Sequence, residues 1–189
     1  MFNRDGARGL IVGLLLGAVL GFFLANLSSR PSNVPPAVIA PSAGAPAAPS
    51  LDSQSALFAA EQEVLKNPKN TEAWVALGND YFDAHKPQQA IDAYAKALEL
   101  NPDNADVLTD QGVMYRELKA FDKAIANWER AQKLNPKHVQ SLYNMGIVYA
   151  NDLGKPDQAR QAWMKVIKLA PGTPQATQAQ DGLKQLGTK

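Results

Sequence analysis

The chain has 189 residues, a formal net charge of +1, no cysteine and two histidines. The balanced charge gives no electrostatic reason to expect nucleic-acid binding. Without cysteine the protein has no disulfide, thiolate metal ligand or cysteine nucleophile, and two histidines are too few for a histidine-rich metal site.

An apolar segment near the amino terminus predicts a membrane-spanning helix. Residues 9–27 carry no charged side chain, and a helix of this length matches the roughly 30 Å hydrocarbon core of a bilayer. A cleaved signal peptide is the alternative, because Arg4 and Arg8 precede the segment. The segment is longer than the usual apolar region of a signal peptide, and no small-residue cleavage site follows it closely. The sequence therefore predicts that residues 1–27 form an uncleaved membrane anchor rather than a cleaved signal peptide.

The flanking charges predict the orientation of this anchor. Arg4 and Arg8 precede it, whereas only Arg30 follows it before Lys66. The excess of positive charge ahead of the helix places the amino terminus in the cytoplasm and the rest of the chain across the membrane. The expected location is a bacterial inner membrane, with the remaining domain in the periplasm.

Glycine recurs at every fourth residue of the apolar segment. Such a stripe lets a second membrane helix approach closely, although glycine is also common in membrane helices without a pairing role. The stripe predicts helix pairing with a second copy or with another protein. Its residues are Gly9, Gly13, Gly17 and Gly21.

Residues 28–52 are rich in proline, alanine and serine and almost free of charge. Such a segment cannot bury enough surface to fold, so we expect a disordered linker with a bias toward extended polyproline II. At ~3.1 Å per residue it would hold the following domain up to about 70–80 Å from the bilayer.

The remaining chain, residues 53–189, repeats with a period of 34 residues. Asn-Pro occurs at 67–68, 101–102 and 135–136, and the same spacing relates three glycines and three tyrosines between these pairs. A fixed period of this length is typical of stacked supersecondary units. The recurring residues are Gly78, Gly112, Gly146, Tyr81, Tyr115 and Tyr149.

This pattern resembles the tetratricopeptide repeat (TPR) family, whose unit is a pair of antiparallel helices. Repeats are expected at 71–104, 105–138 and 139–172. The second departs from the signature at Gln111, and the third has one extra residue within 151–155. The first fills all eight signature places, with Trp74, Leu77, Gly78, Tyr81, Ala90, Tyr94, Ala97 and Pro102.

Helices are also expected at both ends of the repeats. Residues 53–67 end in the same Asn-Pro and predict half a repeat, and residues 174–186 predict a capping helix with Thr173 as its N-cap. The expected fold is therefore all-α, a TPR solenoid of about eight helices and no strand.

No motif for catalysis or cofactor binding is evident. The chain lacks a glycine-rich phosphate loop and any metal-binding spacing, so we expect no enzyme activity, cofactor or metal ion. His85 and His138 fall between helices and are expected to be exposed. Ser141 follows His138 by three residues, but nothing nearby in the sequence would orient the two as a catalytic pair.

The resemblance implies a binding face on the first helix of each pair. Its apolar members (Val75, Phe82, Val113, Tyr143 and Ile147) are expected to form an exposed strip that the core does not need; the alternative is that neighbouring helices bury part of it. The ligand-dependent places in the family correspond here to Val75, Asn79, Phe82, Asp83, Thr109, Val113, Arg116, Glu117, Tyr143, Ile147, Ala150 and Asn151.

One TPR subtype is excluded. Chaperone-binding TPR domains hold a terminal carboxylate with lysine, arginine and asparagine side chains. Asn79 matches that set, but Val75, Asp110 and Gln140 stand where lysine, asparagine and lysine are needed. We therefore do not expect an adaptor for chaperone tails.

The expected function is a scaffold that binds a peptide or protein. An anchor, a linker and a TPR domain in this order resemble the membrane-bound TPR subunits of cytochrome c maturation, and equally the ancillary TPR subunits of the Sec translocon. The alternative is a structural subunit that assembles a membrane complex without capturing a client. Charge is graded along the repeats: residues 71–104 hold six acidic and two basic side chains, a net −4, whereas residues 139–172 hold four bases and two acids, a net +2.

Overall fold

The computed structural model describes residues 51–187. The predicted anchor over 1–27, its glycine stripe (Gly9, Gly13, Gly17 and Gly21) and the predicted linker as far as residue 50 lie outside the described residues. The first described helix begins at Leu51, two residues before the predicted start. Within residues 51–187, no helix is both long and apolar enough to cross a membrane.

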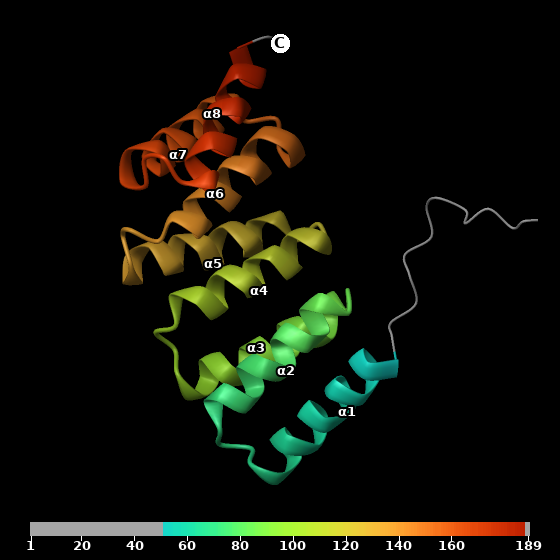
Figure 1. The fold of residues 1–189 in the computed structure, drawn as a ribbon. Helices are drawn as coiled ribbons and strands as arrows, with labels where there is room; N and C mark the ends of the chain where they lie inside the picture. Colours follow the sequence, from blue (N-terminus) through green and yellow to red (C-terminus); the bar gives the residue numbers. More distant parts are fainter. Residues whose placement is uncertain (1–50, 188–189) are drawn as a thin grey trace, which may run out of the picture. The chain divides into compact units, whose positions relative to one another are not determined.

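The described residues form eight α-helices and one π-helical turn, with no strand among them, so the predicted all-α solenoid is confirmed. Figure 1 shows the helices following one another along the stack from α1 to α8. Their bounds are α1 Leu51–Lys66, α2 Thr71–Asp83, α3 Pro87–Leu100, α4 Ala105–Glu117, α5 Phe121–Leu134, α6 Val139–Ile147, the turn η1 Val148–Asp152, α7 Pro156–Leu169 and α8 Pro174–Gly187.

Residues at the helix starts explain where the helices begin. Asn70 and Asn104 precede α2 and α4, and each side chain accepts a hydrogen bond from the backbone N–H three residues later. Thr173 does the same for α8, as predicted. Pro87 and Pro156 occupy the first positions of α3 and α7, where a missing N–H leaves no hydrogen bond unmade.

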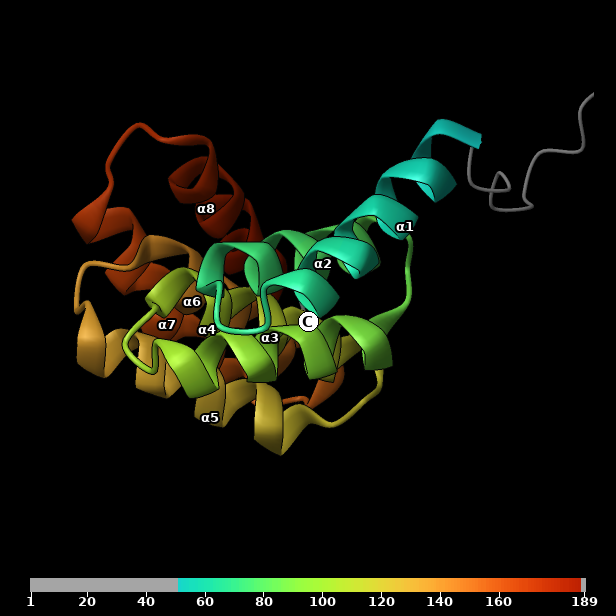
Figure 2. The same ribbon diagram turned by 90° about the horizontal axis from the view of Figure 1, so that it is seen from below.

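Each helix pair closes around a glycine that faces an aromatic ring. A Cβ atom on Gly78, on Gly112 or on Gly146 would overlap the ring of Tyr94, Trp128 or Trp163, respectively. These contacts hold α2 against α3, α4 against α5 and α6 against α7. Figure 2 shows the result, with α3 and α5 on one side of the stack and α2 on the other.

The core runs through the stack as three clusters that share side chains. The first contains Leu57 and Leu77, the second Tyr94 and Met114, and the third Trp128 and Trp163. Trp74 and Tyr81 pack against both the first and the second cluster, and Val113 and Tyr115 pack against both the second and the third. This continuity is expected of a solenoid, because each helix pair buries its apolar face only against its neighbours.

The two irregularities of the repeat are accommodated locally. The extra residue of the third repeat is accommodated by the π-helical turn η1 after α6, and Gly154, two residues beyond the end of this turn, has a positive φ of 61°. Gln111, which replaces the usual apolar residue, is buried. Its amide donates to the Ile91 carbonyl at 3.0 Å and its oxygen accepts from Asn127 at 2.8 Å, so no buried polar atom of this side chain lacks a partner.

Candidate functional site

The structure brings the predicted binding residues together on α2, α4 and the α6–η1 segment, but they differ in accessibility. Asn79, Asp83, Glu117 and Asn151 are exposed. Thr109 was predicted to lie on the binding face. It is only 1% exposed and its hydroxyl donates a hydrogen bond to the Ala105 carbonyl, so its side chain is not accessible to a ligand.

The apolar strip also differs from the prediction. Val75 and Phe82 pack against the second core cluster, Tyr143 and Ile147 against the third, and Val113 against both. All five side chains are half-buried. The expectation that the core does not need them is therefore wrong, because all five side chains pack against buried residues of the core.

A recess opens where α2, α3 and α4 meet, at what we term the first junction. It has a volume of about 300 Å³ and is lined by Asn79, Phe82 and Asp83 from α2, Tyr94 from α3 and Asp110 from α4. The Tyr94 hydroxyl donates to Asn79 Oδ1 at 2.8 Å. We call these five residues the acidic recess.

Burial and nearby negative charge raise the pKa values of Asp110 and Tyr94 in the acidic recess. Burial, together with the negative charge of Asp106, raises the pKa of Asp110 to about 6, although His138 opposes this shift. Burial also raises the pKa of Tyr94, with further contributions from the carboxylates of Asp110 and Asp83. Both carboxylates therefore act electrostatically on the Tyr94 hydroxyl.

The second junction, where α4, α5 and α6 meet, contains a different set of polar groups. Arg116 takes the repeat position of Phe82, and its guanidinium forms an ion pair with Asp152 of η1. Asn144 takes the repeat position of Asp110 and accepts a hydrogen bond from Gln140 at 3.0 Å. The charge of Arg116 is therefore neutralised within the chain.

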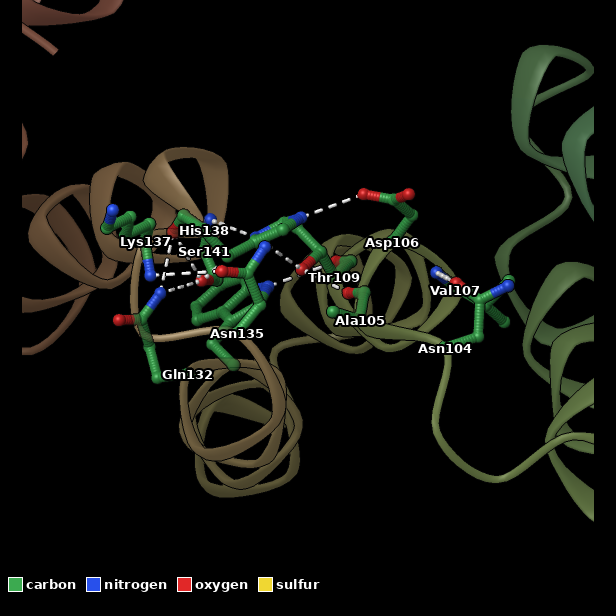
Figure 3. A network of polar contacts seen from close by, with 11 residues as sticks. Asn104, Ala105, Asp106, Val107, Thr109, Gln132, Asn135, Lys137, His138 and Ser141 are labelled. Carbon is green, nitrogen blue, oxygen red and sulfur yellow. Dashed lines mark hydrogen bonds and ion pairs between the residues drawn. The ribbon is translucent and has the colours of Figure 1, made fainter. Parts of the chain in front are cut away.

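A polar network centred on His138 ties the second junction together (Figure 3). Its Nε2 contacts Asp106 Oδ1 at 2.8 Å, and its Nδ1 accepts from the Ser141 N–H at 3.3 Å. Thr109 Oγ1 lies 3.4 Å from the same Nδ1. Because Nδ1 is an acceptor, the neutral ring carries its proton on Nε2, and this N–H donates a hydrogen bond to Asp106 Oδ1. His138 is thus the N-cap of α6 and links α6 to α4.

This network corrects two predictions. The His138 side chain is 11% exposed rather than an exposed turn residue, whereas His85 is exposed as predicted. Asp106, 32 residues earlier in the chain, orients the histidine that was expected to have no such partner.

The serine, histidine and aspartate nevertheless do not form a nucleophilic site. Ser141 is fully buried, its hydroxyl donates to the His138 carbonyl at 3.0 Å, and it accepts from Gln132 at 2.6 Å. A substrate would have no access to this oxygen, and the hydroxyl proton is directed away from the imidazole. Among the described residues, no cluster of three or more histidine or acidic side chains is arranged to hold a metal ion.

Sequence comparison identifies the repeats. Four family profiles described as tetratricopeptide repeat or TPR repeat match residues 71–104, 93–126, 112–152 and 140–173. The chain carries tetratricopeptide repeats. No curated protein sequence matches the chain significantly.

Solved structures show the same fold. A crystal structure of MamA is 26% identical, with a TM-score of 0.62 over 72% of this chain and 83% of that chain. The first TPR domain of Spaghetti (RPAP3), bound to the HSP90 peptide SRMEEVD, is also 26% identical, with a TM-score of 0.57 over 62% of this chain and 90% of that one. The TPR stack is therefore a scaffold of the kind that mediates protein–protein interaction.

Sequence reasoning missed two members of the acidic recess. Tyr94 was assigned to the core because it fills a signature place, and its ring is indeed buried, but its hydroxyl reaches Asn79 in the recess. Asp110 was noted only as a departure from the chaperone-binding set. The signal available in the sequence was the position of Asp110 within the repeat. Asp110 lies one residue before Gln111, on the same predicted helix as Val113.

Proposed function

We propose that the protein is a membrane-anchored, non-enzymatic adaptor that binds a peptide or protein partner on the face formed by α2, α4 and α6. The observation that carries this proposal is the acidic recess, an open polar site whose two carboxylates, on α2 and α4, take part in none of the ion pairs found within residues 51–187. The peptide-bound TPR domain of Spaghetti supports the choice of ligand class, since it aligns with this chain over most of its own length.

The anchor and the location rest on the sequence of residues 1–30. We propose that residues 9–27 span a bacterial inner membrane and that the TPR domain lies in the periplasm. Capture of client proteins in an envelope pathway such as cytochrome c maturation fits this arrangement. Because the chain has no cysteine, a single Met164→Cys substitution provides a unique label on the exposed surface of α7. A membrane-impermeant maleimide should label it in cells with a permeabilised outer membrane; labelling only after inner-membrane lysis would contradict the proposed orientation.

Site-specific photo-crosslinking tests the binding face directly. A photoreactive amino acid replaces Asn79, Asp83 or Asn151 on the proposed face, or Met164 as an exposed control on α7. We expect the three face positions to crosslink one partner through one mapped segment, and a synthetic peptide of that segment to bind the full-length protein. Equal crosslinking of that partner from Met164 would place the contact elsewhere.

The alternative function is assembly of a membrane complex without client capture, and the glycine stripe of the predicted anchor favours it. Two altered proteins separate these functions. Exchanging residues 9–27 for an unrelated membrane helix should preserve partner binding by an adaptor, whereas deleting residues 53–189 should abolish it. The opposite pattern would identify the membrane helix as the functional element.

A further inference from the structure

We propose that the acidic recess binds a lysine or arginine side chain of the partner peptide. This inference rests on the proposed function, because the acidic recess is part of the proposed partner-binding face. It adds the chemistry of one contact, namely a cationic group that enters between α2 and α4.

The size and walls of the acidic recess suit one long basic side chain. It is an open recess of about 300 Å³. The half-buried Phe82 ring offers an apolar wall for the methylene stem and an aromatic face for the cation. The carboxylates of Asp83 and Asp110 are the acceptors for its ammonium or guanidinium group.

Neither carboxylate forms an ion pair among the described residues, although the electrostatic influence of His138 acts to lower the pKa of Asp110. The ion pairs of this part of the chain involve other acids. In the first repeat, Lys86 lies over the Tyr81 ring at 5.7 Å and Lys96 pairs with Glu99 at 2.8 Å, so both local lysines are engaged elsewhere. A partly buried carboxylate without a counter-ion is destabilising, and an incoming cation relieves that penalty.

The second junction shows that the repeat itself does not create this feature. There, Arg116 replaces Phe82 and pairs with Asp152, and the neutral Asn144 replaces Asp110. An external cation would therefore meet an internal ion pair and a neutral amide rather than two carboxylates that form no ion pair. The first repeat, with its net charge of −4, is the part of the stack that complements a basic ligand.

The same charges oppose an acidic ligand. The HSP90 peptide bound to Spaghetti, SRMEEVD, has two glutamates and a terminal aspartate against one arginine, so its net charge is negative. Asp110 and Asp83 would repel such a peptide from this chain. The raised pKa of Asp110, about 6, adds a pH dependence, because the carboxylate attracts a cation only when it is ionised. Affinity for a basic peptide should therefore fall as the pH is lowered through 6.

Peptide selection on the full-length protein in detergent micelles tests this inference. The probe is a phage-displayed library of random dodecapeptides, selected on the wild type. An enriched sequence is then synthesised with blocked ends, together with analogues in which each basic residue is replaced by glutamine. Fluorescence anisotropy gives their affinities for the wild type, for Asp83→Asn/Asp110→Asn and for the charge-matched control Asp103→Asn/Asp122→Asn, whose exposed acids lie outside the acidic recess.

We expect enriched peptides to share a basic residue whose replacement by glutamine weakens binding to the wild type by about tenfold or more. The same replacement should change binding to Asp83→Asn/Asp110→Asn less than twofold, and the control variant should behave as the wild type. SRMEEVD should not compete. Circular dichroism establishes that each variant is folded.

The outcomes separate this inference from the proposed function. Two results would show that the acidic recess is not a cation site while the adaptor function stands. Either the selected peptides bind the face without a preference for basic residues, or the glutamine analogue loses the same affinity for the wild type and for Asp83→Asn/Asp110→Asn. If no peptide is enriched over a phage control, peptide binding on this face fails and the inference fails with it.

Discussion

The first and second junctions of the stack use the same repeat geometry and end with opposite surface chemistry. At the first, Tyr94 closes the helix pair, and two carboxylates that form no ion pair within residues 51–187 line a recess. At the second, Trp128 closes the pair and donates its indole N–H to the Thr109 carbonyl at 3.0 Å, while His138 joins α4 to α6. The second junction pairs its charged groups internally and leaves one buried polar atom, Asn144 Nδ2, without a hydrogen-bond partner among the described residues, whereas the first leaves two carboxylates available to a ligand.

This difference indicates how a repeat protein separates stability from binding. The signature positions build the same wedge in both junctions, because glycine on one helix faces an aromatic ring on the next. Positions outside the signature determine whether the remaining polar groups pair within the chain. Residues that act at the first junction should therefore affect binding more than stability, and residues of the second junction should do the reverse.

The largest expected effect is at the closed second junction. Trp128→Ala removes a fully buried ring and its hydrogen bond, so we expect a loss of about 3–5 kcal/mol in the free energy of unfolding. Urea denaturation followed by circular dichroism measures this loss. A loss below about 1 kcal/mol would mean that the neighbouring helices collapse into the space and that the wedge is not the main support of the stack.

The His138 network should show a smaller effect. His138→Ala removes the N-cap of α6 and its bond to Asp106, and we expect a loss of about 1–2 kcal/mol. His138→Asn should restore most of this, because asparagine caps α2 and α4 at the same repeat position. The exposed His85 is the control, and His85→Asn should leave the urea midpoint unchanged. Equal losses for the alanine and asparagine variants would show that the Asp106 bond, and not the cap, is what matters.

The first junction should respond in the opposite sense. Since burial raises the pKa of Asp110 from 3.8 to about 6 in the folded protein, the folded state binds this proton more tightly and ionisation destabilises it. Asp110→Asn should therefore raise the free energy of unfolding by about 1 kcal/mol near pH 7.5, a value reduced to allow for solvent screening. The difference from the wild type should shrink as the pH falls through 6 and vanish below 3.8.

Urea titrations of both proteins across this pH range measure the effect of Asp110. A stability gain accompanied by loss of basic-peptide binding would show that the acidic recess is maintained for binding at the expense of stability. A loss of stability near pH 7.5 would show that Asp110 has a stabilising partner and would contradict the unpaired state of its carboxylate.

The smallest expected effect is that of the Tyr94 hydroxyl. Tyr94→Phe keeps the buried ring against Gly78 and removes only the hydrogen bond to Asn79, whose side chain is exposed to water. We expect a loss of about 0.5–1 kcal/mol by urea denaturation, within the range of a single net hydrogen bond. A loss comparable to that of Trp128→Ala would mean that the hydroxyl organises the whole first junction.

Much of the fold was predictable because its determinants are local and periodic. The 34-residue spacing of Gly78, Gly112 and Gly146 predicts helix pairs that approach closely, and asparagine or proline at fixed places marks the helix starts. The extra residue in the third repeat was also visible, although the sequence did not predict that a π-helical turn would absorb it. The binding face was assigned from repeat positions alone, which do not report how far each side chain is covered.

The helix pairs, their order and the aromatic wedge were all predictable, because each depends on residue types that recur at a fixed interval within one or two helices. The pairing of the polar groups, in contrast, became visible only in the folded stack. Asp106 meets His138 across 32 residues, and Asp110 joins Asn79 and Tyr94 at one recess although three helices supply them. Such contacts depend on how far one helix pair rotates against the next, and that rotation is set by side-chain packing across the stack rather than by any local pattern.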